Sequence, residues 1–217
     1  GFVFWNHPNW DSQRKDGIAR LDTFHEFLIE KRLLHGIEVV NEDTYSDEAL
    51  KIALENNLTI LGTSDIHGLT NWQYEISKGG HRPITFVKVE SKTPESLKKA
   101  LFEGKTVIWF KDLLVGKEEN LRALISENIT INSLKYPEDK TIANVEITNH
   151  GAAPIQLEYL GKYTFHKRST FFSIPANSTI KLNVKTLVKK NEIKLPFRVL
   201  NAIVAPKEYL ELSFIAK

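Results

Sequence analysis

The sequence predicts two units: an α/β unit over residues 1–126 and a small all-β, Ig-like sandwich over residues 127–217. In the first unit, short apolar runs alternate with amphipathic helical patterns, which is typical of right-handed βαβ units and a parallel sheet or barrel. In the second, apolar and polar residues alternate with a period of two between turn signals. The charge changes too: residues 1–130 hold 16 basic and 20 acidic residues, whereas residues 131–217 hold 13 and 7.

Strands and helices are predicted in turn along the first unit. The strands are expected at 2–6, 37–40, 59–63, 84–89 and 107–110. The helices between and after them are expected at 21–35, 46–56, 93–102 and 117–126. Two helix starts are well marked: Ser46 is suited to capping, and Thr93 is followed by Pro94 at the first helical position.

Short strands are also predicted throughout the second unit. They are expected at 141–149, 155–159, 170–174, 179–186, 197–204 and 209–215. The segment joining the two units near Glu127 is short, so we expect the units to pack together. This sandwich carries no pattern that indicates chemistry.

The composition excludes several classes of protein. With 41% hydrophobic and 26% charged residues, the 217-residue chain has the composition of an ordinary globular protein. No apolar run approaches the ~18 residues of a membrane span. The absence of Cys excludes disulfides and Cys-ligated metals. A net charge of +2, without an aromatic-rich basic motif, gives no strong signal for nucleic acid.

The start of the chain is unusual. Methionine is absent, and Gly1 leads straight into an apolar run at 2–5. We therefore expect a fragment, a processed product or a truncated form, with a short native protein as the alternative. The sequence does not fix a compartment, although a bacterial, periplasmic or secreted location is favoured over a cytoplasmic one.

Polar residues that suit chemistry follow three of the predicted strands. These residues are His7, Asn41, Asp65 and His67. Since ligands bind where the carboxyl ends of parallel strands converge, we expect all four on one rim. Asp65 and His67 project to the same side of an extended segment, and a carboxylate beside an imidazole suits Zn, Mn or Fe.

Plainer interpretations stay open for each of these residues. His7 precedes a proline and is also suited to ending a strand, and Asp65 is suited to capping a short turn with His67 as its neighbour. Asn41 is more typical of a turn than of a substrate contact, and Glu38 is expected to be structural. The tryptophans at 5, 10 and 72 are suited to lining the mouth of a site, but packing is the more ordinary role for them.

Three motifs resemble the second half of a PHP (polymerase and histidinol phosphatase) domain. They are 6–8 (NHP), 36–41 (GIEVVN) and 62–68 (GTSDIHG), and their order, spacing and strand context match. The runs 82–87 and 100–106 are also similar, so the resemblance covers about residues 1–116. It implies the C-terminal part of a distorted (β/α)7 barrel, and metal-dependent hydrolysis of phosphoesters by a cluster of up to three divalent ions.

The resemblance also implies roles for particular residues. His7, Asp65 and His67 correspond to metal ligands that serve different ions of the cluster. The opening His-x-His pair of the family, its bridging Glu and its further histidines have no counterpart in this chain, and His25, His35 and His81 do not lie at ligand positions. We therefore expect a missing N-terminal segment of the barrel, in the same parent chain or a separate one, to supply the other ligands.

If the site is complete, clustered ions lower the pKa of a bound water and screen the phosphoryl oxygens. We assign Asp65 and His67 to catalysis and Asn41 and Arg82 to substrate binding, with Arg82 suited to a phosphoryl oxygen and equally to a surface position. The substrate is then a phosphorylated small molecule or a nucleotide. Two alternatives remain: a non-catalytic or degenerate product whose sandwich binds or packs, and a metal-dependent hydrolase of C–N bonds.

Overall fold

The computed structural model describes residues 1–138 and 140–217 as two compact units. The first comprises Gly1–Leu121 with Ile203–Glu208, and the second comprises Arg122–Ala202 with Tyr209–Lys217. Within the described residues, no helix combines the length and the apolar character needed to cross a membrane.

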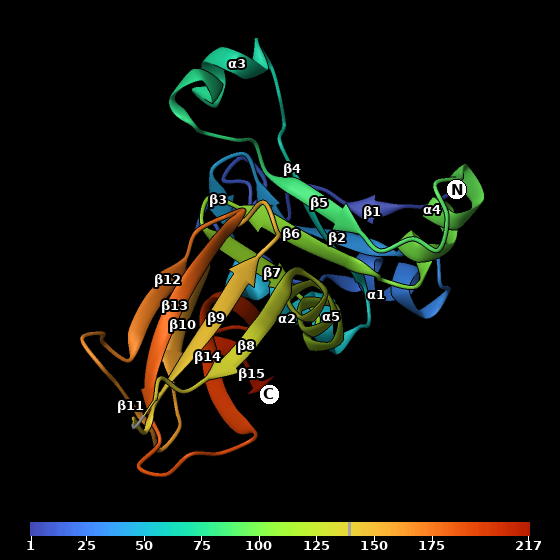
Figure 1. Ribbon diagram of the computed structural model, residues 1–217. Helices are drawn as coiled ribbons and strands as arrows, with labels where there is room; N and C mark the ends of the chain where they lie inside the picture. Colours follow the sequence, from blue (N-terminus) through green and yellow to red (C-terminus); the bar gives the residue numbers. More distant parts are fainter. Residues whose placement is uncertain (139) are drawn as a thin grey trace. The chain divides into compact units, whose positions relative to one another are not determined.

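A small sheet with a parallel centre organises the first unit (Figure 1). Strands β1 (Phe4–Trp5) and β4 (Thr59–Thr63) pair in parallel with β2 (Gly36–Asn41). Strand β3 (Thr44–Tyr45) turns back and pairs antiparallel with the end of β2. The three parallel strands were predicted, and their carboxyl ends lie along the same edge of the sheet.

The helices of this unit begin where their capping residues stand. In α1 (Thr23–Glu30), the side chain of Asp22 accepts from two backbone N–H groups; in α2 (Asp47–Glu55), Ser46 accepts from one. Helix α4 (Pro94–Phe102) is capped by Thr93, as predicted. The predicted helix at 21–35 is shorter than expected, because Arg32 has a positive φ of 55° and interrupts it.

The remaining strands of the first unit do not follow the prediction of a parallel sheet or barrel. Strands β5 (Ile84–Val87), β6 (Thr106–Phe110) and β7 (Leu113–Gly116) pair antiparallel in that order. Strand β7 was not predicted from the sequence. Because only a tight turn at 111–112 joins β6 to β7, these two strands have to run in opposite directions.

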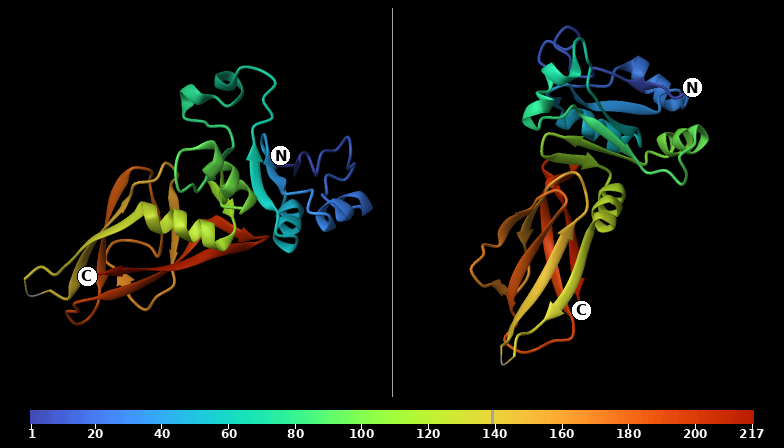
Figure 2. Two further views of the ribbon diagram at one scale, coloured as in Figure 1. Left: turned by 90° about the vertical axis from the view of Figure 1, so that its right-hand side faces the viewer. Right: turned by 45° about the horizontal axis from the view of Figure 1, so that its top comes forward.

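Between β4 and β5 the chain leaves the sheet as an arm that carries α3 (Thr70–Gln73) and the 3₁₀ turn η1 (Ile76–Lys78). The arm stands clear of the strands of the first unit in Figure 1 and in the left view of Figure 2. The core lies elsewhere, between β2, β4, β6 and α2, where Ile37, Val40, Leu50, Ile60 and Ile108 are at most 1% exposed. Their burial holds the parallel strands in place.

The second unit is built from two antiparallel sheets. One has the order β11 (Thr164–Phe165), β13 (Ser178–Lys185), β9 (Ile142–Asn149) and β8 (Ile129–Lys135). In the other, β10 (Ile155–Tyr159) pairs with β12 (Phe171–Ile174) and β14 (Ile193–Ala205), and β14 also pairs with β15 (Glu208–Ala216). Helix α5 (Glu118–Asn128) leads directly into β8.

The core of the second unit follows the period-two pattern of its sequence. In β9, Ala143, Val145 and Ile147 are fully buried, while the residues between them are part-exposed. Phe197 is also fully buried, and Tyr159 packs against it with ring centroids 5.3 Å apart. The strands predicted from alternation are therefore present, although β8 was not predicted.

Candidate functional site

The candidate site lies where three parallel strands of the first unit end. His7 follows β1, Asn41 is the last residue of β2, and Asp65 follows β4. Parallel register places the ends of β2 and β4 side by side, since Asn41 pairs with Thr63. Strand β1 pairs with the start of β2, and the chain after it continues along β2 to His7. Residues from distant parts of the sequence thus meet at one edge.

The backbone turns in a left-handed conformation at each of these strand ends. The φ angle is 52° at His7, 52° at Glu42 and 42° at Asp65. This region is unfavourable for most residues other than glycine, although Asn, Asp and His adopt it more readily, and turns elsewhere in the described residues, such as those at Arg32 and Lys111, adopt it too. The turn directs the chain sharply away from the sheet just where the polar side chains begin.

A buried carboxylate contacts both the backbone and the ring of His7. Glu38 of β2 is only 2% exposed, and its Oε2 lies 2.7 Å from the backbone nitrogen of His7 and 3.1 Å from ring atom Nδ1. The amide nitrogen of Asn41 also lies 3.1 Å from Nδ1. The opposite ring nitrogen, Nε2, faces Asp65.

The carboxylate of Asp65 lies between two imidazoles. Its Oδ2 is 3.8 Å from Nε2 of His7, and its Oδ1 is 3.5 Å from Nε2 of His67. The side chains of His7 and Asp65 are 26% and 32% exposed, whereas that of His67 is 83% exposed. One carboxylate thus offers one oxygen to each ring, at an edge open to solvent.

Neighbouring residues support this arrangement. Thr63 donates a hydrogen bond to Oε1 of Glu38, and Asn41 lies 3.4 Å from the hydroxyl of Thr63. On the other side, the hydroxyl of Tyr74 donates to the carbonyl of Ser64 at 2.6 Å. Burial, together with the nearby carboxylates of Glu42, Asp43 and Asp65, raises the pKa of Tyr74, so this hydroxyl keeps its proton.

A cleft of about 800 Å³ opens over these groups. Besides His7, Asn41, Asp65 and His67, it is lined by Asn9, Trp10, Asp11, Gly17, Glu42, Asp43 and Thr44. Trp10 is 52% exposed, and its ring stands at 61° to that of His7. None of the described residues that line the cleft is Lys or Arg, so carboxylates outnumber cationic side chains in its lining.

The donors fit a divalent cation in part. Imidazole nitrogen and carboxylate oxygen suit Zn, Mn or Fe, and two ligands of one tetrahedral ion at about 2.0–2.2 Å lie roughly 3.4 Å apart. The separations of 3.5 and 3.8 Å are close to that value. However, among the described residues no group of three or more His, Cys, Asp or Glu side chains is arranged to hold one ion. The site therefore offers pairs of ligands and needs further ones.

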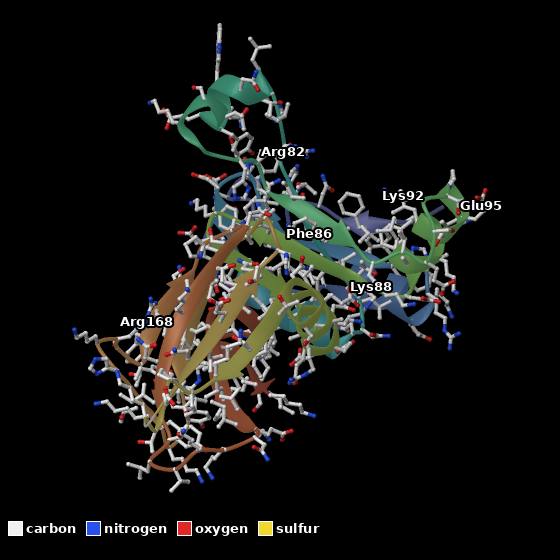
Figure 3. All side chains as sticks on the ribbon, in the orientation of Figure 1. Arg82, Phe86, Lys88, Lys92, Glu95 and Arg168 are labelled. Atoms are coloured by element: carbon white, nitrogen blue, oxygen red, sulfur yellow. The ribbon has the colours of Figure 1, made fainter. Side chains whose placement is uncertain are left out.

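Four of the five residues singled out from the sequence come together, and the fifth does not. His7, Asn41, Asp65 and His67 all line the cleft. Arg82 does not line it; it is exposed and lies where the arm returns to β5 (Figure 3). Its position gives no support to a role in phosphate binding.

The three tryptophans singled out from the sequence, of the four in the chain, have different surroundings. Trp5 stacks on His25 with ring centroids 3.8 Å apart, which is the packing role that the sequence favoured. Trp10 lines the cleft instead. Trp72 lies on the arm, 79% exposed, so packing within the described residues does not account for it.

Sequence reasoning missed the part that Glu38 plays. The residue was expected to be structural, and it is indeed buried, but its carboxylate contacts His7. One signal was available: a Glu within the otherwise apolar run of β2 needs buried donors. The sequence could not show which donors these are, because His7 and Thr63 reach it only across the sheet.

The two units of the chain resemble known proteins to different extents. A family model described as an Ig-like domain matches residues 129–215, so the prediction of an Ig-like sandwich is confirmed. Among solved structures, the chain is similar to a two-domain protein from Bacteroides vulgatus ATCC 8482 that contains a predicted PHP-like metal-dependent phosphoesterase. The two share 29% sequence identity with a TM-score of 0.87.

That likeness covers 98% of this chain and 61% of the Bacteroides chain. This chain therefore spans about three fifths of the length of the solved protein. No curated protein matches the chain. The comparison supports only the general kind of protein expected from the motifs, because the similar protein is itself described as containing a predicted PHP-like phosphoesterase.

Proposed function

We propose that this chain forms part of a metal-dependent phosphoesterase. The observation that carries the proposal is the meeting of His7, Asp65 and His67, with one oxygen of the carboxylate facing each ring nitrogen. The similarity to a protein that contains a predicted PHP-like phosphoesterase supports the same class of reaction.

The side chains have distinct parts in the proposal. His7, Asp65 and His67 would hold divalent ions, and the carboxylate of Asp65 would also orient the attacking water. Asn41 offers its amide to the substrate from the edge of the cleft. Bound divalent ions supply activation of water near neutral pH and neutralise the charge of the phosphoryl group.

We propose that the remaining ligands come from residues outside these 217, in the same parent protein. Strand β1 is an edge strand of its sheet. Val3 and Phe4 are 48% and 40% exposed. Phe24 and Phe27 of α1 are 63% and 49% exposed. A further parallel strand beside β1, covered by this apolar surface, would bring its carboxyl end next to His7. The greater length of the Bacteroides protein is consistent with such a segment.

A second candidate is a protein without catalytic activity. It is favoured by one observation: in the described ranges, 1–138 and 140–217, the donors approach in pairs and not as a closed set. In that case the chain is a fragment or a degenerate domain whose sandwich serves as a binding or packing module.

The test measures metal content and hydrolysis together. The parent protein is equilibrated with Zn²⁺ or Mn²⁺, dialysed, and assayed for bound metal and for turnover of chromogenic phosphomonoesters and phosphodiesters. The variants H7N and D65N should lose bound metal and activity while remaining folded, because Asn tolerates the left-handed backbone at both positions. H150A, in the second unit, should behave like the unaltered protein.

Turnover of a C–N substrate in place of phosphoesters would replace the proposed reaction with the alternative hydrolase. If the parent protein hydrolyses neither, and binds no metal, the non-catalytic candidate stands.

A further inference from the structure

We infer that Glu38 is a positioning residue: it fixes the tautomer of His7 and holds the backbone of His7 so that Nε2 faces Asp65. The inference rests on the proposed function to the extent that His7 is a metal ligand. It concerns a residue that does not line the cleft and acts only through another side chain.

Three donors converge on the buried carboxylate of Glu38. Oε2 accepts from the backbone N–H of His7 at 2.7 Å and lies 3.1 Å from Nδ1 of the same residue. Oε1 accepts from the hydroxyl of Thr63. A carboxylate that is 2% exposed needs such partners, since an ionised group without them is very unfavourable in the interior.

The ring atom Nδ1 lies near one acceptor and one donor. It forms a hydrogen bond with only one of them, depending on whether it carries the proton. It lies 3.1 Å from the carboxylate oxygen of Glu38, an acceptor, and 3.1 Å from the amide nitrogen of Asn41, a donor. A charged acceptor makes the stronger hydrogen bond, so Nδ1 carries the proton and donates it to Glu38. The amide of Asn41 keeps an alternative acceptor in the hydroxyl of Thr63, 3.4 Å away.

This assignment leaves the lone pair of the ring on Nε2. Nε2 lies 3.8 Å from Oδ2 of Asp65, so a lone pair and a carboxylate oxygen face each other across a gap suited to a cation. A carboxylate that receives the other ring N–H of a ligating histidine fixes the tautomer and the orientation of the ring.

The same carboxylate fixes the main chain. His7 has a φ of 52°, and its backbone N–H points to Glu38 in that conformation. Both the orientation of the ring and the turn that carries it therefore depend on one buried group. A purely structural Glu38 would stabilise the sheet without setting the protonation of His7, and the tautomer separates the two roles.

The first experiment needs no variant at the site. The metal-free protein, labelled with ¹⁵N-histidine, is studied by NMR at about pH 8, where an ordinary imidazole is neutral. The signals of His7 are those missing from H7N. We expect a proton on Nδ1 and none on Nε2. A proton on Nε2 would overturn the inference.

The second experiment measures Zn²⁺ affinity by competition with a chromophoric chelator. E38Q should bind Zn²⁺ roughly 10–100-fold more weakly than the unaltered protein, the usual effect of removing such a partner. E38D, which keeps the charge but shortens the reach, should fall between them. E55Q changes a 60% exposed carboxylate on α2 and should have no effect. Equal affinity in E38Q and the unaltered protein would contradict the inference.

The outcomes separate this inference from the proposed function. A proton on Nδ1, together with a parent protein that hydrolyses no phosphoester, supports the role of Glu38 and refutes the phosphoesterase. Hydrolysis by a protein with the proton on Nε2 does the opposite. If E38Q does not fold, E38D and the tautomer of the unaltered protein decide the matter.

Discussion

The hydroxyl of Tyr74 donates a 2.6 Å hydrogen bond to the carbonyl of Ser64, the residue immediately before Asp65. This contact links the arm to the turn that carries the carboxylate of the site. Because Asp65 has a φ of 42°, the turn needs support from its surroundings to keep its shape.

Replacing Tyr74 with Phe should loosen that turn. The lost hydrogen bond should lower the free energy of unfolding by about 1 kcal/mol, measured by urea denaturation. Zn²⁺ affinity should fall as well, because Asp65 is no longer held. Y209F, in the second unit, is the control and should leave Zn²⁺ affinity unchanged. Unaltered affinity in Y74F would show that the turn holds its shape without the arm.

Asn41 and Arg82 should respond differently to substitution. Asn41 lines the cleft, whereas Arg82 does not. With a chromogenic phosphoester, N41A should lower kcat/KM about tenfold, the effect of losing roughly 1.4 kcal/mol of transition-state binding. R82A should stay within about twofold on the same scale. A larger loss in R82A than in N41A would restore the role that the sequence suggested for the arginine.

The acidic lining should disfavour substrates with extra negative charge. Asp11, Glu42 and Asp43 line the cleft together with Asp65, without a Lys or Arg among the described lining residues. D43N should raise kcat/KM for a phosphoester substrate that carries a second phosphate more than for the same substrate without it. The difference should shrink in high salt, which screens exposed charges. A salt-independent effect would point to a direct contact instead.

Acid should destabilise the start of α1. A hydrogen bond from the backbone N–H of His25, followed by the charge of its ring, lowers the pKa of Asp22 below 3.8. A carboxyl group with a lowered folded-state pKa adds stability above its unfolded value, and that stability is lost as the pH falls through the folded value. D22N keeps a capping oxygen but cannot ionise.

Urea denaturation between about pH 6 and pH 2.5 measures this effect. The stability of D22N should depend less steeply on pH below about pH 4 than that of the unaltered protein. Parallel curves would show that the ionisation of Asp22 makes no difference to folding.

Local patterns allowed much of the fold to be predicted. The predictions that were wrong have physical causes. Ser46 and Thr93 cap their helices as expected, because capping depends on residues within one turn. The direction of β5 and β6 is not encoded locally: a helix joins them, as in a parallel pair, yet they run antiparallel. The short strand β3 and the arm were too brief or irregular to carry a periodic signal.

The candidate site shows the same limit. The residues at the carboxyl ends of the strands were predicted because parallel pairing brings such ends together, and His7, Asn41, Asp65 and His67 do line one cleft. The partners that orient them, Glu38 and Tyr74, depend on contacts across the sheet and across the arm. No spacing in the sequence encodes those contacts.

The left-handed turn at Glu42 has a consequence for the evolution and engineering of this protein. Glycine adopts that conformation without a steric penalty, so E42G should relieve about 1 kcal/mol of backbone strain, while removing one acidic side chain from the cleft and the hydrogen bond that it accepts from Gln73. Selection for thermal robustness alone would then erode the polar character of this rim. A glutamate that persists there in thermostable descendants would be a sign that the side chain is used.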